Sequence, residues 1–194
     1  MSNENKPGSA WRTLSNREIY DNPWIRVEEH RVINPSGGEN QYGKVCFKSF
    51  AVAILALEGD ADEHTYLVGQ ERYTLGRYSW EIPMGGAPLG SSALQSAQRE
   101  LKEETGLNAG RWREVMQLDI SNSVTDEYGV VFHARDLDQG ETQFEETEDI
   151  SIRRLPFADA LGMALKGEIT DALSVAAILH YAYECQQGST RNEL

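Results

Sequence analysis

The chain has 194 residues and a formal net charge of −13, with 18 Lys and Arg against 31 Asp and Glu. This length predicts one domain with a sizeable core. The acidic balance argues against a protein that coats nucleic acid, because phosphate backbones are bound mainly by Lys and Arg. Small phosphorylated substrates stay open, since a bound metal and a few local arginines can reverse the local field.

The two cysteines, Cys46 and Cys185, have no metal-like spacing and indicate no disulfide framework. The N-terminus is polar, and no apolar run is long enough to span a membrane. We therefore expect a cytoplasmic protein with no membrane contact. None of the four histidines is spaced for a metal site, and we interpret His133 as structural.

The first part of the chain predicts strands. Residues 1–10 are expected to form a disordered arm. Thr13–Tyr20 is a weak strand candidate and Trp24–Ile33 a better one, and Glu39–Phe47 returns after a turn as the second arm of a hairpin. A long hairpin needs something to cover its edges.

The rest of the chain alternates strand and helix patterns. The apolar run Phe50–Leu57 predicts a buried central strand. Six further segments predict strands or helices, in this order: strands over Tyr66–Gln70, Trp112–Ile120, Tyr128–Leu137 and Ile150–Leu155, then helices over Phe157–Leu165 and Thr170–Glu184. Five apolar residues line one side of the last helix: Ala172, Val175, Ala176, Leu179 and Tyr183. This alternation predicts an α/β fold.

Between these segments, Gly85–Leu107 reads as a glycine-rich loop followed by a helix. Ser92 and Gln95 fit a capping box, so the helix is expected to start near Ser91 or Ser92, and Gly106 fits the position just past its end. Four residues recur at helical spacing and make one apolar stripe: Ala93, Leu94, Ala97 and Leu101.

Acidic residues crowd the end of this helix. Glu100 and Glu104 lie one turn apart, and Glu103 lies beside them, where Arg99 can pair with it. Like charges at this spacing cost roughly 0.2–0.5 kcal/mol, and they lie at the unfavourable end of the helix dipole. A hard divalent cation such as Mg²⁺ would offset this, because it prefers oxygen ligands. The alternative interpretation is a solvated acidic face.

The complete stretch resembles the Nudix box, in which a glycine is followed at fixed spacing by Arg-Glu, a pair of Glu residues and a second glycine. The matching positions run from Gly85 through Arg99-Glu100 to Glu103-Glu104 and Gly106. Ser91 stands where the family usually has Glu, a residue not usually counted among the core metal ligands. The resemblance implies an α/β/α sandwich with a mixed sheet.

This resemblance implies a domain organisation. The Nudix hydrolase domain is expected over residues 49–187, after an N-terminal antiparallel β extension over residues 11–48 and before a flexible tail over residues 188–194. In the branch of the family that acts on ADP-ribose and sugar nucleotides, such an extension helps form a homodimer, and the partner subunit often contributes to the substrate pocket. Trp24 then either stacks on a nucleobase or packs within the hairpin.

Two segments before the box resemble the same branch, namely Gln70-Glu71-Arg72-Tyr73 and Trp80-Glu81-Ile82-Pro83-Met84-Gly85. By this resemblance Arg72 contacts the diphosphate of the substrate, and a guanidinium fork suits phosphate oxygens. Arg77 is a second candidate, with a surface role as the alternative. Glu81 contacts substrate or supports the metal site, or is simply a strand carboxylate.

The resemblance assigns the catalytic groups as well. Glu100, Glu104 and the backbone carbonyl of Met84 are expected to bind Mg²⁺, or Mn²⁺ in its place. Arg99 positions Glu103, which is a further metal ligand candidate. An acidic segment that resembles the ADP-ribose pyrophosphatases adds Glu146 as general base and Glu148 as a further metal ligand.

The expected function is metal-dependent hydrolysis of a nucleoside diphosphate sugar or ADP-ribose to a nucleoside monophosphate and a sugar phosphate. Asn122 occupies a position where ADP-ribose-specific relatives typically carry proline, which leaves other nucleoside diphosphate sugars open. One alternative is a non-catalytic nucleotide sensor, which Ser91 favours and the complete set of box carboxylates opposes. The other is a housecleaning pyrophosphatase of nucleoside triphosphates. The acidic charge argues against an RNA substrate.

Overall fold

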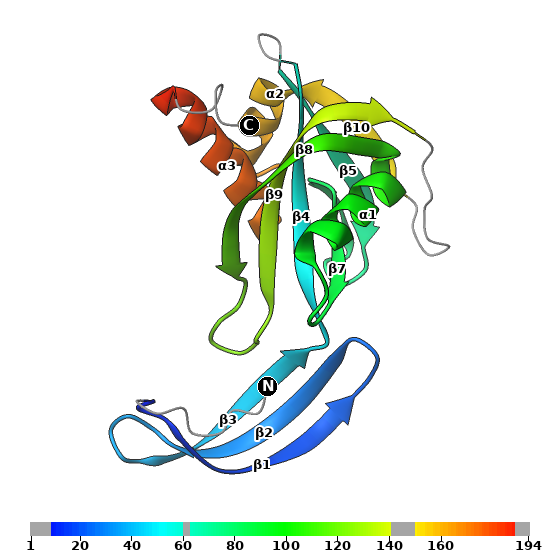
Figure 1. Cartoon of the computed structure of the whole chain (residues 1–194). Helices are drawn as coiled ribbons and strands as arrows, with labels where there is room; N and C mark the ends of the chain where they lie inside the picture. Colours follow the sequence, from blue (N-terminus) through cyan, green and yellow to red (C-terminus); the bar gives the residue numbers. More distant parts are fainter. Residues whose placement is uncertain (1–8, 60–62, 141–149, 189–194) are drawn as a thin grey trace. The chain divides into compact units, whose positions relative to one another are not determined.

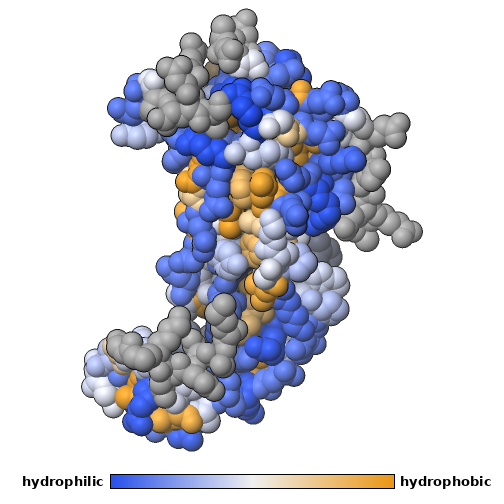
Figure 2. Space-filling view, in the orientation of Figure 1, coloured by the Kyte–Doolittle hydropathy of each residue, from blue (hydrophilic) through white to orange (hydrophobic). Residues whose placement is uncertain are grey.

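A computed structural model describes residues 9–59, 63–140 and 150–188 of the chain (Figure 1). The chain divides into two compact units. The first runs to Phe50 and includes Asp119–Tyr128, and the second contains Ala51–Leu118 and continues from Gly129. No helix within the described ranges is long and apolar enough to cross a membrane. The face of the molecule shown in Figure 2 is mainly hydrophilic, as the charged composition predicts.

The first unit contains a three-stranded antiparallel sheet in the order β1-β2-β3. Its strands are β1 (Arg12–Asp21), β2 (Ile25–Ile33) and β3 (Glu39–Phe47), close to the predicted segments. Asn34 organises the turn between β2 and β3, because its side-chain oxygen accepts hydrogen bonds from the backbone N–H groups of Ser36 and Gly38. Gly37 adopts a φ of +85° there, which favours glycine.

The loop 119–128 belongs to this first unit, although it follows a strand of the second. The Val45 N–H of β3 donates to the carbonyl of Val124 at 2.9 Å. Lys44 of β3 forms an ion pair with Asp126, with 2.7 Å between Nζ and Oδ2. The sequence does not predict this contact, because β3 and the loop 119–128 are about eighty residues apart in the chain.

The second unit is built on a seven-stranded sheet with the central order β10-β5-β4-β9-β8, to which β6 adds beside β5 and β7 beside β4. The strands are β4 (Ser49–Glu58), β5 (His64–Arg72), β6 (Arg77–Glu81), β7 (Met84–Pro88), β8 (Leu107–Asp119), β9 (Tyr128–Gln139) and β10 (Ser151–Pro156). β4 pairs in parallel with β9, whereas β10 and β5 are antiparallel, so the sheet is mixed. Residues 52–57 of β4 are almost completely buried, as the apolar run predicts.

Among the described residues, three helices cover this sheet: α1 (Ala93–Thr105), α2 (Phe157–Leu165) and α3 (Ala172–Gln187). Figure 1 shows α1 on one side of the sheet and α2 with α3 on the other. The predicted α/β/α sandwich with a mixed sheet and an N-terminal antiparallel extension is therefore confirmed.

The glycine-rich stretch differs from its prediction. The sequence indicates a loop from Gly85 onward, but Met84–Pro88 forms strand β7 and pairs with β4. The loop is limited to the residues just before α1, where Gly90 has a φ of +84°. Glycine is depleted in strands, but strand propensity depends strongly on context, and the pairing of β7 with β4 places these residues in the sheet.

The inner face of α3 also differs from the apolar side noted in the sequence. The buried residues are Leu173, Ser174, Ala177, Ile178 and Tyr181, whereas Tyr183 is 62% exposed. Most of the helix surface is apolar, so periodicity alone does not select the face that packs on the sheet. A buried serine takes part because its hydroxyl bonds to the backbone of another element.

Candidate active site

Helix α1 begins and ends where the sequence predicts. The Ser92 hydroxyl accepts a hydrogen bond from the Gln95 N–H, and Gly106 ends the helix with a φ of +73°. The buried face is turned from the predicted apolar stripe, however, because Leu94 is exposed while Glu100 and Glu104 are only 9% and 2% exposed. The two carboxylates thus point inward.

Arg99 joins two of the box carboxylates. Its Nη1 donates to Glu103 at 2.6 Å, and its Nη2 donates to Glu100 at 2.5 Å and to the carbonyl of Gly86 at 3.1 Å. Burial by itself lowers the pKa of Arg99, but Glu100 and Glu103 outweigh burial and raise it. The predicted Arg99–Glu103 pair therefore forms, and the same guanidinium anchors α1 to β7.

The start of β7 lies against the two inward carboxylates. The Met84 N–H donates to Glu104 at 2.9 Å. At Gly85 a side-chain carbon would overlap the carboxylate of Glu100, so only glycine leaves that carboxylate its place. The donors gathered here are carboxylate oxygens beside strand backbone, and such a set fits a hard divalent cation.

Arg72 and Glu81 form a two-bond pair from neighbouring strands β5 and β6. Arg72 Nε donates to Glu81 at 3.1 Å and Nη2 at 2.5 Å. Glu81 is buried, and Arg72 is about one-third exposed. The hydrogen bond to Glu81 raises the pKa of Arg72, and the charges of Glu104 and Asp171 add to this effect. The predicted substrate arginine thus lies in the electrostatic field of the box carboxylate Glu104.

Two other predicted positions have structural partners. Arg77, the second substrate candidate, donates to the Thr170 hydroxyl at 3.0 Å on the exposed surface. Ser91 donates from its hydroxyl to the carbonyl of Pro88 at 2.7 Å and closes the turn before α1. Ser91 thus stabilises the turn before α1, and it lacks the carboxylate of the Glu that the family usually has at this position.

Trp24 and Asn122 both belong to the first unit. Trp24 is 71% exposed in the turn before β2, where its N–H donates to the Asn22 side chain at 2.8 Å. A cavity of about 390 Å³ opens on the same unit, with Asn122, Trp11 and Tyr42 among its lining residues. Trp24 does not line this cavity, so the aromatic walls there come from residues that the sequence analysis did not single out.

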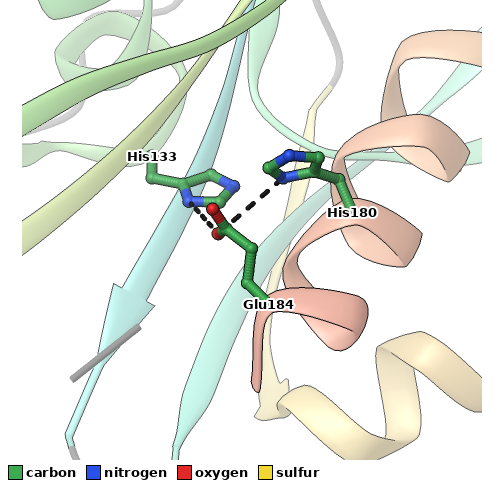
Figure 3. A group of neighbouring side chains, drawn as sticks. All are labelled: His133, His180 and Glu184. Atoms are coloured by element: carbon green, nitrogen blue, oxygen red, sulfur yellow. Dashed lines mark ion pairs between the residues drawn. The ribbon is translucent and has the colours of Figure 1, made fainter. Parts of the chain in front are cut away.

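The structure gathers one group of possible metal ligands that the sequence missed. His133, His180 and Glu184 lie with their ligand atoms within 4.8 Å of one another (Figure 3). The only sequence signal was the four-residue spacing of His180 and Glu184, because His133 comes from β9.

An arginine already supplies the positive charge in this group. Arg113 donates to both oxygens of Glu184, at 2.8 and 2.6 Å, and its Nη2 lies 3.1 Å from His133 Nδ1. The guanidinium of Arg113 therefore contacts both His133 and Glu184, the groups that a metal ion would have to contact. We interpret the group as a salt-bridge network that ties α3 to β8 and β9, in agreement with a structural His133.

Glu146 and Glu148 lie outside the described residues, in the segment 141–149. Their assignment as general base and metal ligand stays a prediction. Within the described ranges, the site consists of the box carboxylates, the start of β7 and the Arg72–Glu81 pair.

Comparison with known proteins gives matches for both parts of the chain. Residues 48–177 match the NUDIX domain, and residues 11–45 match the nucleoside diphosphate sugar hydrolase N-terminal domain. The ADP-ribose pyrophosphatase of Mycobacterium tuberculosis is 31% identical over 87% of this chain and 82% of its own length. The ADP-ribose pyrophosphatase of Bacillus subtilis is 28% identical over 86% of this chain and 90% of its own length.

The fold has a close counterpart among solved structures. The crystal structure of an ADP compounds hydrolase superposes with a TM-score of 0.78 and covers 95% of this chain and 100% of that chain. The two sequences are 21% identical, so this likeness concerns the fold alone.

Proposed function

This chain belongs to the Nudix family of pyrophosphohydrolases, and we propose that it hydrolyses the diphosphate bond of a nucleoside diphosphate sugar or of ADP-ribose. The products are a nucleoside monophosphate and a sugar phosphate. The observation that carries the proposal is the pair of buried carboxylates, Glu100 and Glu104, against the start of β7. Burying two like charges one turn apart is unfavourable unless cations offset them. Arg99 supplies one positive charge at Glu100, and a bound divalent cation would add the further positive charge that the pair favours.

Glu100, Glu104 and the backbone carbonyl of Met84 would hold the divalent cation, with Glu103 and Glu148 as further ligands. Mg²⁺ is the expected ion, with Mn²⁺ as a substitute, because both accept oxygen ligands. When bound, the ion would offset the negative charge of the diphosphate and lower the pKa of a water molecule.

The chain's own groups orient the reactants. Glu81 holds Nε and Nη2 of Arg72, and Arg72 would contact the diphosphate of the substrate with its remaining N–H groups. Arg99 holds the carboxylates of Glu100 and Glu103 in position through one hydrogen bond to each. Glu146 would orient the attacking water and take its proton. Its role rests on the sequence resemblance.

The substrate class is supported by the relatives. Two matched relatives are named ADP-ribose pyrophosphatase, and the N-terminal match is named for nucleoside diphosphate sugar hydrolases. Both names describe substrates in which a diphosphate joins a nucleoside to a sugar. Asn122, in place of the proline typical of ADP-ribose-specific relatives, leaves the base and the sugar open.

The chain is also proposed to form a homodimer through its first unit. β1 is an outer strand of the three-stranded sheet and is exposed along nearly all of its length. Leu14, Ile19 and Tyr20 are exposed apolar residues on it. An exposed edge strand with apolar side chains needs a cover, and a second copy of the chain supplies one.

A hydrolysis screen tests the function. The purified protein is incubated with Mg²⁺ and with ADP-ribose, ADP-glucose, UDP-glucose, GDP-mannose, NADH, diadenosine polyphosphates or nucleoside triphosphates, and products are separated by chromatography. We expect a nucleoside monophosphate and a sugar phosphate from one of the diphosphate sugars, and no product after addition of EDTA. Pyrophosphate from a triphosphate alone would indicate the housecleaning activity instead, and metal-independent binding without turnover would indicate a sensor.

Glu104→Gln tests the metal site within this proposal. The amide oxygen still accepts from the Met84 N–H, so we expect the fold to persist, but the charge that holds the cation is lost. Turnover should fall by more than about 100-fold, since mutating even the residues behind a metal ligand costs about 10–100-fold. Glu114→Gln, the same change at an exposed position of β8, should keep full activity. A Glu104→Gln protein with near wild-type turnover would remove Glu104 from the site.

A further inference from the structure

The segment Ile82–Met84, which leads from β6 to the first residue of β7, is hydrogen-bonded to three other elements in turn. The Ile82 N–H donates to the hydroxyl of Ser174 on α3 at 3.0 Å. The proline carbonyl accepts from the Ile54 N–H of β4 at 2.8 Å. The methionine N–H donates to Glu104 of α1 at 2.9 Å. The segment that carries the proposed metal-binding carbonyl thus has a fixed course through the site.

The Ser174 hydroxyl can take only one orientation in this arrangement. Its Oγ donates to Asp171 Oδ1 at 2.8 Å, and the same oxygen accepts the Ser174 N–H at 2.7 Å. A carboxylate only accepts and a backbone N–H only donates, so the hydroxyl must give its proton to Asp171 and present a lone pair to Ile82. Asp171 therefore sets the direction of the bond that Ser174 makes.

Packing alone does not account for a serine at this position. Ser174 is fully buried on the inner face of α3, between Leu173 and Ala177. Burying a hydroxyl is unfavourable unless it is hydrogen-bonded, and alanine would fill a similar space. The Ile82 backbone is buried too, so its N–H needs the partner that Ser174 provides.

Asp171 lies close to the site as well as to Ser174. Its charge contributes, together with that of Glu104, to raising the pKa of Arg72. The N-cap residue of α3 therefore lies within electrostatic range of the Arg72 charge. This nearness is independent of the hydrogen bonds to Ser174.

We propose that Ser174, oriented by Asp171, is a positioning residue that fixes the Met84 carbonyl against Glu104 for metal binding. Ile82 is two residues from Met84. The peptide bonds between them are planar and the proline between them has a fixed φ, so a shift of the Ile82 backbone also shifts the Met84 backbone. Loss of the Ser174 bond removes one of the three contacts that hold this segment, and we expect the Met84 carbonyl to shift relative to Glu104. The inference rests on the proposed function, because it concerns the metal site of that reaction.

The test measures Mn²⁺ binding to the full-length protein without substrate, from the electron paramagnetic resonance signal of free Mn²⁺, and the Mn²⁺ dependence of hydrolysis. We expect Ser174→Ala to raise the Mn²⁺ Kd about tenfold, within the range typical of residues that support metal ligands. Asp171→Ala should raise it less, and Asp171→Asn should bind as the wild type does, since an amide oxygen still accepts the hydroxyl proton.

Thr65→Val is the matched control. Thr65 is a buried hydroxyl residue on β5 whose Oγ1 has no hydrogen-bond partner among the described residues, and valine has nearly its shape. Its Mn²⁺ Kd should equal that of the wild type. Circular dichroism confirms that each variant is folded at the temperature of measurement.

The outcomes separate the inference from the function on which it rests. If Glu104→Gln weakens Mn²⁺ binding while Ser174→Ala and Asp171→Ala bind as the wild type does, the positioning role is wrong and the metal site stands. If the wild type binds Mn²⁺ no better than Glu104→Gln, the proposed metal site itself is wrong. Lower thermal stability of Ser174→Ala with an unchanged Kd would show a purely structural serine. Should Ser174→Ala fail to fold, equal Kd values for Asp171→Ala and Asp171→Asn overturn the inference.

Discussion

Gly85 shows how a single residue controls the position of a charged group. Its neighbour Glu100 places its carboxylate where a β carbon would stand. Gly85 has no left-handed φ, so the position requires glycine for space and not for backbone freedom. Glycine at the start of the box therefore has a direct packing reason.

Gly85→Ala is expected to keep the fold and to lower kcat at least tenfold, because the added methyl group displaces Glu100 from its place beside Arg99. Even a displacement of about 1 Å in a catalytic arrangement can cost on the order of 100-fold. The measurements are steady-state kinetics on the substrate found by the screen and thermal unfolding.

Gly162→Ala is the control for this variant. A β carbon at Gly162 in α2 meets nothing within 4 Å, so activity should not change, and helix propensity should add roughly 1 kcal/mol of stability. Wild-type kcat for Gly85→Ala would show that Glu100 either tolerates displacement or has no role in turnover.

At the scale of elements, α3 is tied to the sheet at both of its ends. Ser174 bonds to the backbone before β7 near its start, and Glu184 binds Arg113 of β8 near its end. Burial raises the pKa of Glu184, but the bonds from Arg113 outweigh it and lower the pKa overall. The helix therefore depends on polar contacts as well as on its apolar face.

His133 gives this network a pH dependence. The residue is fully buried, and burial, with the charge of Arg113 adding to it, lowers its pKa from 6.5 to about 3. Between these values the unfolded chain binds a proton that the folded chain does not. Stability therefore rises with pH across this window, by up to about 1.4 kcal/mol per pH unit, and this contribution is complete above about pH 6.5.

We expect His133→Gln to remove this contribution while an amide oxygen still accepts from Arg113. Urea unfolding at pH 4, 5, 6 and 7 gives the free energy of unfolding of each protein. The value for the wild type minus the value for the variant should decrease as the pH falls. Parallel curves for wild type and His133→Gln would contradict the prediction.

At the scale of the whole molecule, the proposed homodimer depends on the first unit. Hydrophobic groups are visible among hydrophilic ones on the face of the molecule in Figure 2, and Ile19 on β1 is 52% exposed. We expect light scattering to give twice the chain mass of 21.7 kDa. Ile19→Lys should shift the protein toward a monomer, because a buried unpaired ammonium group opposes association.

Leu165→Lys provides the comparison for this variant. Leu165 is also an exposed apolar residue, but it lies at the end of α2 in the second unit, so the dimer should persist. A monomeric wild type, or a dimeric Ile19→Lys protein, would exclude β1 as the interface.

The sequence by itself determined the features that local signals specify. Helix α1 starts at its Ser92 cap and ends at Gly106 because side-chain capping and glycine stereochemistry act within one turn. The buried strand β4 follows from its apolar run, and the four-residue spacing of Arg99 and Glu103 sets their pairing on the helix surface.

Only the tertiary structure decided how these parts meet. That Glu104 receives the Met84 N–H and that the buried face of α3 includes Ser174 depend on contacts between segments 20 and 92 residues apart in the chain. That Glu81 holds Arg72 depends on the register in which β5 and β6 pair. Periodicity reports which residues share a face of one element, but it does not report which face a neighbouring element covers. The site depends on that second choice, because its charges are placed by strands and helices that meet only when the sheet is complete.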